Sequence, residues 1–422
     1  MKRTLLLLMS MLLLLPGCNK VVNLMNPDAE PELQEEEPSR PQYIVLTKSE
    51  ESVRDAANRF GRDVFVNLFR EADGRDVAFS PLSLSLALSM TAEGAEGDTY
   101  KEFVKVLGFG DVSKADVGSF YKTMIAGLVT ADEKVSFSSN NSLWVQTGYP
   151  VKNDFKTLLS EYYAVENYSV NFGKPDTEAT VKAINQWCSD KTDGKIPALF
   201  SALDPQTRMV LVNALLFKAP WAFEWEVRKD RPFTTAAGTS VQKDYLFVDK
   251  MLPYREFETY EWVSVPYGNG LYELILMLPK GGQDLSTMLA SFDAADLMMR
   301  TDASVELQFP MFSTDYSTEE TLIPILKEMG LKLPFDPGKA NLSGMVDSSQ
   351  FLPDENLYVA KLLQKVRIDV NEKGTEFAAV TGSAVGATSV PERVLLNFNR
   401  PFVYAIWERS SATVLLYGTV SQ

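Results

Sequence analysis

The segment Asn371–Arg393, near the C-terminus, constrains the fold of this chain more than any other stretch of its sequence. It runs NEKGTEFAAVTGSAVGATSVPER, and between Gly374 and Val390 it holds one charged residue, Glu376, and no proline. Surface loops usually contain Pro, Asn and Asp, because these residues fix turns. Small and β-compatible residues fill this segment instead. It can therefore be exposed as a loop, and it can also join a sheet as a strand.

The composition predicts a large folded body and excludes several classes of function. Of the 422 residues, 45% are hydrophobic and 23% are charged, which is enough for the core of one large domain or two. The net charge of −15 disfavours nucleic-acid binding, since phosphate contacts need clustered Lys and Arg. The chain has no histidine, which excludes Ser-His-Asp and Cys-His catalysis and imidazole-based zinc sites. We expect no catalytic residue, no metal and no cofactor.

Residues 1–17 have the pattern of a bacterial lipoprotein signal peptide. A basic pair precedes an apolar run at 5–15, and Pro16 and Gly17 follow immediately before Cys18. The run is too short to span a bilayer as a helix, and this order of regions marks a signal that is removed. We expect cleavage before Cys18 and lipidation of that cysteine. Pro16 departs from the usual Ala or Ser, so an ordinary secretory signal, cut elsewhere, is the alternative.

Residues 18–45 are predicted to be an acidic, proline-rich tether. Five glutamates and four prolines lie between positions 27 and 41. Such a stretch buries little apolar surface, and its like charges repel, so it stays extended. We therefore expect a folded body at 46–422 that is lipid-anchored in a bacterial cell envelope. The anchor is expected in the outer membrane, with the body in the periplasm or exposed at the surface.

Hydrophobic periodicity predicts that the body mixes helices and strands. Apolar residues at helical spacing predict a helix at 52–71, and Ser80, followed by proline, predicts the N-cap of a buried helix at 82–93. The apolar run at 209–217 is typical of a strand buried on both faces. Its one polar member, Asn213, must find partners, because an unpaired buried amide costs about 1–3 kcal/mol. Further strands are predicted at 261–267, 271–278, 305–309, 365–370, 402–408 and 413–420.

Several short motifs resemble those of the serpins, a family of protease inhibitors. They include the sequences at 79–83, 183–196, 211–221, 372–379 and 398–402. The fourth, EKGTEFAA, resembles the proximal hinge of the serpin reactive loop, and the fifth, FNRPF, resembles the sequence that follows this loop. The resemblance extends from about residue 53 to the C-terminus. It implies an α+β fold with three β-sheets and about eight or nine helices. It also implies one metastable domain with an exposed reactive-centre loop at about 372–396.

The resemblance also implies roles for residues beneath the sheet that would receive the loop. A polar cluster called the shutter, where strands must part, would consist of Ser80, Ser83, Asn213 and Gln364. Trp221 would mark the breach, where the loop first enters. Gln364 stands where serpins often have histidine, and an amide cannot change its charge near neutrality as an imidazole can. A simple helix cap is the alternative for Ser80, and a core aromatic is the alternative for Trp221.

The serpin resemblance implies a mechanism of inhibition that begins when the target protease cleaves the loop. A protease cleaves the loop, and the cut loop inserts into the main sheet while the enzyme is still attached. The register counted from Glu372 places the cut between Thr388 and Ser389. The small aliphatic flanks favour elastase-like or subtilisin-like serine proteases, with papain-like cysteine proteases as a further class of target. We expect a monomer that has no nucleic-acid partner and touches a membrane only through its lipid anchor.

The hinge contains the main departure from the serpin pattern, Phe377. The hinge residues that the resemblance implies are Glu372, Gly374, Thr375, Phe377, Ala378 and Ala379. Strand alternation from Thr375 points Phe377 inward, where inhibitory serpins usually have alanine and where overpacking costs about 1–3 kcal/mol. A non-inhibitory serpin, acting as a protease substrate or a binding protein, is therefore the alternative. Outside this family, the alternative is a carboxylate-based glycosidase or a glycan-binding lipoprotein, although no carboxylate pair has a distinctive spacing.

Overall fold

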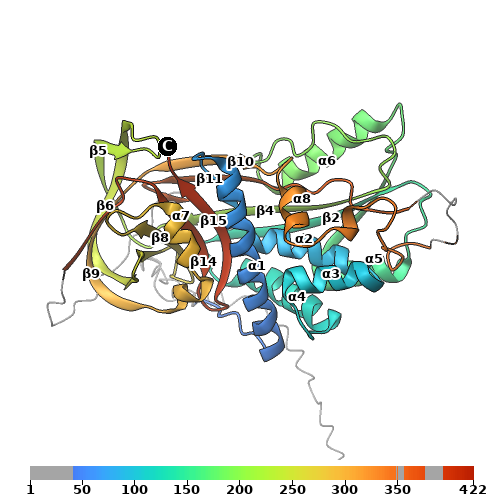
Figure 1. Cartoon of the computed structure of the whole chain (residues 1–422), viewed down its shortest axis with the longest axis horizontal. Helices are drawn as coiled ribbons and strands as arrows, with labels where there is room; N and C mark the ends of the chain where they lie inside the picture. The colour runs from blue at the N-terminus through green and yellow to red at the C-terminus, as the bar shows by residue number, and fades with distance from the viewer. Residues whose placement is uncertain (1–40, 348, 350–355, 376–392) are drawn as a thin grey trace, which may run out of the picture. The chain divides into compact units, whose positions relative to one another are not determined.

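The computed structural model describes residues 41–375, apart from 348 and 350–355, and residues 393–422 (Figure 1). Within them, fifteen strands pair into two β-sheets, and eight α-helices and two short 3-10 helices are present. The predicted α+β class and the predicted number of helices are confirmed.

The six-stranded sheet has the order β10-β11-β12-β4-β2-β3. Its strands are β10 (Phe312–Ser317), β11 (Lys365–Asn371), β12 (Gly374–Thr375), β4 (Met209–Pro220), β2 (Ser136–Gln146) and β3 (Val165–Val170). In the described residues, β4 and β11 are not paired with each other, because the short strand β12 stands between them and pairs with both at one end.

The nine-stranded sheet has the order β1-β15-β14-β8-β7-β6-β9-β13, with β5 paired to β6. Its strands are β1 (Ala78–Phe79), β15 (Thr413–Val420), β14 (Phe402–Glu408), β8 (Tyr272–Pro279), β7 (Tyr260–Pro266), β6 (Ser240–Glu256), β9 (Thr301–Pro310), β13 (Arg393–Asn397) and β5 (Glu226–Thr234). The long strand β6 pairs with β9 through residues 245–254 and with β7 through residues 254–256. The sequence predicts three sheets, and β6 joins two of them into this single nine-stranded sheet.

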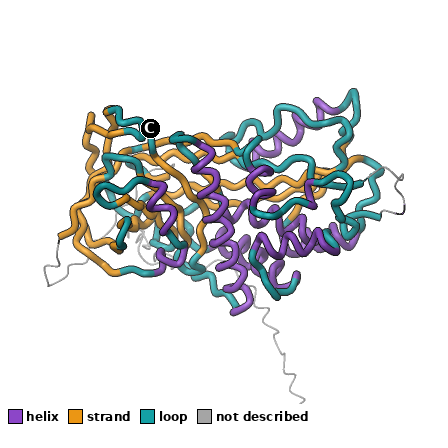
Figure 2. Tube along the Cα trace, viewed as in Figure 1, coloured by secondary structure: helices purple, strands orange, loops and turns teal. Residues whose placement is uncertain are grey.

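The helices lie against the faces of these sheets (Figures 1 and 2). They are α1 (Lys48–Ala72), α2 (Pro81–Glu93), α3 (Gly97–Leu107), α4 (Lys114–Thr130), α5 (Asn153–Tyr163), α6 (Thr177–Lys191), α7 (Leu285–Ser291), α8 (Leu322–Glu328) and the 3-10 helices Ala294–Met298 and Leu333–Phe335. In Figure 1, α6 lies on one side of β2 and β4, and α2 lies on the other, and both helices contact β4.

Helix α2 is buried because it lies between the two sheets. It contacts β4 of the six-stranded sheet and β15 of the nine-stranded sheet, and α1 covers it as well. Ser80 is its N-cap, with the Ser80 Oγ accepting a hydrogen bond from Ser83 N at 3.2 Å, and Pro81 opens the helix. A proline at the first helical position loses no hydrogen bond, because that N–H has no partner within the helix. The N-terminus of α2 is thereby fixed beneath the six-stranded sheet.

The chain packs against the folded body before residue 46, where the body was predicted to start. Gln42 N donates to Ala131 O at 2.8 Å, and Ile44 N donates to Ser410 Oγ at 2.9 Å. The Ile44 side chain is buried. Residues 42–44 of the predicted tether 18–45 therefore belong to the body. The rest of that tether up to residue 40, the predicted signal 1–17 and Cys18 lie outside the described residues.

Among the described residues, none of the helices has the length and apolar character needed to cross a membrane.

Candidate functional site

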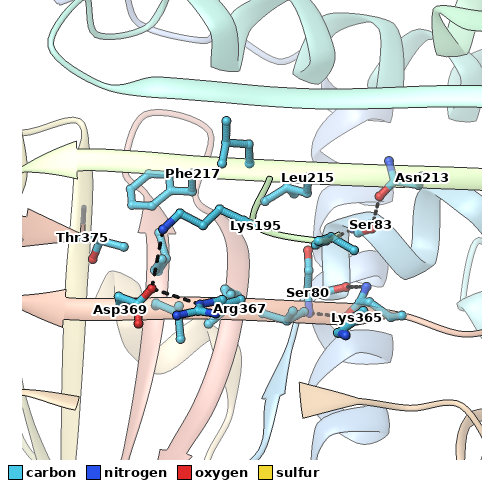
Figure 3. A pocket seen from close by; sticks show the side chains of 17 residues that line it. Ser80, Ser83, Lys195, Asn213, Leu215, Phe217, Lys365, Arg367, Asp369 and Thr375 are labelled. Carbon is cyan, nitrogen blue, oxygen red and sulfur yellow. Dashed lines mark hydrogen bonds and ion pairs between the residues drawn. The ribbon is translucent and has the colours of Figure 1, made fainter. Parts of the chain in front are cut away.

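A gap in the six-stranded sheet, which we call the slot, separates β4 from β11 beyond the end of β12. A cavity of about 50 Å³ occupies the part nearest to β12, with Thr375 at one end and the shutter residues Ser80, Ser83 and Asn213 at the other (Figure 3). A second cavity of about 320 Å³ continues between Met209 and Leu211 of β4 and residues 357–362 before β11. The slot therefore follows β4 along most of its length.

The hinge residues Gly374 and Thr375 already lie between the two strands. Gly374 pairs with Pro220 of β4, and Thr375 pairs with Ala219 of β4. Gly374 has a φ of +138°, and a Cβ added there would lie 2.1 Å from the carbonyl oxygen of Ala219. Only glycine fits this position without displacing backbone. The other hinge residue that can be placed, Glu372, is exposed in the turn before β12.

Thr375 is held on the core side of the sheet by a tyrosine that the sequence analysis did not single out. Its side chain is 3% exposed, and its Oγ1 lies 2.6 Å from Tyr267 Oη. Burial raises the pKa of Tyr267 well above its usual value, so this hydroxyl stays protonated and can donate to Thr375. A tyrosine in a hairpin gives no sequence signal that it will meet a residue more than a hundred positions away.

Trp221 binds the turn before the hinge through both its side chain and its backbone. Its indole Nε1 donates to Asn371 O at 2.7 Å, and its backbone N donates to Lys373 O at 3.3 Å. The indole stacks on the Tyr267 ring with centroids 4.4 Å apart and an angle of 10°. Trp221 thus lies where β12 begins, and it is buried as a core aromatic is.

The four predicted shutter residues meet at the N-terminus of α2. Ser80 and Gln364 bond reciprocally, with Ser80 N donating to Gln364 Oε1 at 2.6 Å and Gln364 Nε2 donating to Ser80 O at 3.0 Å. Ser83 Oγ donates to Asn213 Oδ1. The N-terminus of α2 therefore binds β4 through Asn213. It also binds Gln364, the residue that precedes β11. Ser80 is also the helix cap, so the two interpretations of Ser80 are compatible.

Further polar residues complete this cluster, and the sequence analysis missed them. Asn213 Nδ2 donates to Asn141 Oδ1 at 2.7 Å and to Ser139 Oγ at 3.1 Å, both on β2. Gln364 N donates to Thr318 Oγ1 at 2.7 Å. The polar run SFSSNNS at the start of β2 is the signal that could have found the first two, since such side chains need partners when a strand is buried.

Replacing Asn213 with Ala should destabilise the intact protein by about 1–3 kcal/mol, because partner groups in the cluster lose their hydrogen bonds while remaining buried. Urea denaturation at equilibrium measures this change in the free energy of unfolding. Asn140→Ala is the matched control, because the Asn140 amide donates to Ser138 Oγ on its own strand and to Lys191 O at the end of α6, and does not belong to the cluster. Equal stability of the two variants would contradict a structural role for the shutter.

The turn that follows α6 crosses the slot on its outer side. Asp193 pairs with Lys218 of β4, with Nζ and Oδ2 2.8 Å apart. Lys195 pairs with Asp369 of β11 at 3.9 Å (Figure 3). Burial opposes ionisation of Asp369, but hydrogen bonds from Ser313 and Arg367 and the charges of Arg367 and Lys195 outweigh it and lower the pKa. The two ion pairs connect the walls of the slot. A strand that enters there must separate them, although partly exposed pairs each contribute only about 0.2–1 kcal/mol.

The distal end of the predicted loop is fixed by Arg393 at the start of β13. Its guanidinium Nη2 lies 2.5 Å from Asp249 Oδ2 and 2.7 Å from Glu306 Oε2. The predicted loop of 372–396 therefore includes residues that belong to β12 and β13. The predicted hinge residues Phe377, Ala378 and Ala379 and the predicted cut between Thr388 and Ser389 lie outside the described residues.

In the part of the chain that the structure describes, no group of three or more Cys, Asp or Glu side chains is arranged to hold a metal ion.

Known proteins that are similar to this chain share one family. The family described as Serpin (serine protease inhibitor) matches residues 55–422. Serpin B11 of Homo sapiens is 31% identical over 397 residues, which cover 88% of this chain and 99% of that protein. The leukocyte elastase inhibitor of Equus caballus is 30% identical over 390 residues, with coverage of 88% and 99%. The native crystal structure of a thermophilic serpin, tengpin, has a TM-score of 0.78 at 26% identity and covers 92% of this chain and 98% of its own.

Proposed function

The chain belongs to the serpin family, and we propose that it inhibits serine proteases by cleavage and insertion of its reactive loop. The observation that carries this proposal is the slot between β4 and β11, in which Gly374 and Thr375 already lie. Residues that follow Thr375 can extend β12 without a change of direction or register. The similarity to the leukocyte elastase inhibitor supports a protease as the target.

In this mechanism the target protease supplies the bond-breaking chemistry. Its catalytic serine Oγ adds to the carbonyl carbon of Thr388, the Thr388–Ser389 bond breaks, and the new Ser389 amine takes up the proton that the serine loses. An ester then joins the enzyme to Thr388. Insertion of the cut loop moves this ester, with the enzyme attached, away from the place where the enzyme docked. Inhibition succeeds when insertion is faster than hydrolysis of the ester.

The slot supplies the driving force for that movement. Along most of their length, the facing edges of β4 and β11 have no strand between them in the described residues. A strand inserted there gains ladder hydrogen bonds on both sides, each worth about 0.5–1.5 kcal/mol net. The ordering of the loop opposes this gain by about 1–2 kcal/mol per residue. Additional stabilisation comes from side chains that enter the core side of the slot.

Incubation with an elastase-type serine protease tests the proposed function. We expect a covalent complex that survives SDS and has the mass of the protease plus the N-terminal part of the inhibitor. Subtilisin-like serine proteases and papain-like cysteine proteases extend the panel to the other expected classes of target. Simple clipping of the loop by every protease, with no complex, would refute inhibition and favour a non-inhibitory serpin that is cleaved as a substrate.

Replacing Thr388 with Arg should shift the preference of the loop from elastase-like to trypsin-like proteases by at least about tenfold in rate. A trypsin-like pocket needs a basic residue, and Arg393 is unsuited because its guanidinium is bound by Asp249 and Glu306. Mass spectrometry of the released C-terminal peptide identifies the cut, and Thr388→Val is the control that should keep the elastase preference. A cut after Arg393 in the unmodified protein would overturn the assignment of the Thr388–Ser389 bond.

We also propose that the protein is a lipid-anchored member of a bacterial cell envelope. The support is the basic pair, the apolar run and the small residue that precede Cys18, followed by an acidic tether. Metabolic labelling with a radioactive fatty acid should mark the full-length protein and should fail with Cys18→Ala. Label retained by Cys18→Ala would exclude this cysteine as the anchor.

A further inference from the structure

We propose that the outer face of β6, β9 and β13 is a second contact surface for the target protease, and that it favours proteases with a basic surface beside their active site. The inference rests on the proposed function, because it takes a protease as the partner. It adds a determinant of specificity that does not belong to the reactive loop.

The strand registers determine which side chains share this surface, which we call the docking face. Strand β13 pairs with β9, and β9 pairs with β6. Directly paired residues point to the same side of a sheet, as do residues two apart in one strand. The six side chains of the docking face form two rows, with Arg393, Ser304 and Met251 in one and Leu395, Glu306 and Asp249 in the other.

The docking face combines exposed apolar side chains with charges. Leu395 is 68% exposed and Met251 is 45% exposed. On the opposite face of the same strands, Val305, Leu307 and Leu396 are buried, so the sheet has one covered side and one open side. Exposed apolar groups bordered by polar ones are typical of protein-binding surfaces, and Met and Arg are enriched there.

The charges of the docking face are predominantly negative. Arg393 Nη2 lies 2.5 Å from Asp249 Oδ2 and 2.7 Å from Glu306 Oε2. One guanidinium is shared by two carboxylates, which leaves the group with one negative charge. Asp302 is exposed two residues before Ser304 and adds another. The face therefore attracts a basic surface, and the net charge of −15 strengthens the attraction at a distance.

The docking face begins at the residue where the reactive loop ends. In the sequence, the expected cut after Thr388 precedes Arg393 by five residues, which span at most about 18 Å. A protease domain of about 230 residues has a radius of gyration of about 17 Å, which for a sphere corresponds to a radius of about 22 Å. A protease bound at the cut is thus held within its own radius of Arg393.

This short connection also indicates which part of the protease meets the docking face. Arg393 follows the cut, so the face lies towards the side of the active site that binds the residues after the scissile bond. We therefore expect the partner to have Lys and Arg side chains on that side, together with an apolar contact for Leu395. Complementary charge raises the rate of association and leaves the bond-breaking chemistry unchanged.

Reversing the charge of Asp249 tests the electrostatic part of this inference. With a cationic elastase-type serine protease at low salt, Asp249→Lys should lower the second-order rate constant of complex formation by about tenfold. An anionic elastase-type protease should not be slowed. Asp111→Lys is the matched control, because it makes the same change of charge in the exposed turn after α3, at the other end of the body from β9 (Figure 1). Equal slowing by both substitutions would show that the net charge, and not the docking face, is responsible.

Replacing Leu395 with Ser tests the apolar contact. The probe is the same cationic protease with its catalytic serine replaced by alanine, which binds the loop without cutting it. We expect Leu395→Ser to raise the Kd of this complex about fivefold, from the loss of part of one buried leucine. Val129→Ser, which changes an exposed apolar residue of α4, should leave the Kd unchanged.

The two measurements separate this inference from the proposed function, because binding of the inactive protease requires no insertion. If the unmodified protein forms the covalent complex, and neither Asp249→Lys nor Leu395→Ser changes its rate constant or Kd, the docking face is refuted and inhibition by insertion stands. If the loop is only clipped, but Leu395→Ser still raises the Kd, inhibition is refuted and the docking face is supported.

Discussion

Cleaving the loop between Thr388 and Ser389 should raise the Tm of the protein by about 10–30 °C. The intact sheet has a slot that follows β4 from Thr375 towards Met209. Insertion fills it with a strand that makes at least about ten new hydrogen bonds of 0.5–1.5 kcal/mol each, while side chains that enter the core side of the slot offset the ordering cost of the loop. For a protein of this size, each kcal/mol raises the Tm by about 2 °C. Differential scanning calorimetry of the intact and the elastase-cleaved protein measures the difference.

The Tm change expected from cleavage without insertion is the reference for this experiment. A nick in an exposed loop should by itself lower the Tm slightly or leave it unchanged, because it adds no contact and increases the freedom of the unfolded chain. A Tm of the cleaved protein that is equal to or below that of the intact protein would therefore contradict insertion.

Replacing Thr375 with Arg should turn the protein from an inhibitor into a substrate and lower the yield of covalent complex by about 100-fold. The Thr375 side chain is buried against Tyr267, and an unpaired guanidinium in that place costs several kcal/mol, where each 1.4 kcal/mol is a factor of ten. The cut between Thr388 and Ser389 lies well beyond this residue in the sequence, so the loop should still be cleaved. Gel analysis with elastase measures the ratio of complex to clipped protein.

Thr375→Ser is the matched control for this substitution. Serine keeps the hydroxyl that meets Tyr267 Oη at 2.6 Å, and it removes only a methyl group. We expect this variant to form complex at close to the unmodified level. If Thr375→Arg forms complex as well as Thr375→Ser does, entry of the hinge into the sheet is not required for inhibition.

The elements that the sequence predicted well are those whose local pattern agrees with their final environment. The apolar run at 209–217 lies within β4 (Met209–Pro220), and the helix predicted at 82–93 is α2 (Pro81–Glu93) with Ser80 as its cap. The predicted hairpin of 261–267 and 271–278 corresponds to β7 and β8. Asn213 could be singled out because a lone amide in an apolar strand requires partners.

The features that the sequence did not predict depend on contacts between distant segments. Strand β6 joins two of the three expected sheets into one because it changes partner from β9 to β7 at Tyr254, and the local sign of that change is a single residue, Pro253. Lys195 and Asp369 meet only because α6 covers the sheet. The cavity beside Phe217 exists because β4 and β11 are apart beyond β12, which no local sequence pattern shows.

The most direct test of insertion into the slot is a crystal structure of the loop-cleaved protein. We expect β12 to extend beyond Thr375 between β4 and β11. The turn that carries Asp193 and Lys195 should have moved away from β4 or β11. A cleaved protein in which β4 and β11 still have no strand between them beyond Thr375, or in which the two strands pair directly, would contradict the proposed mechanism.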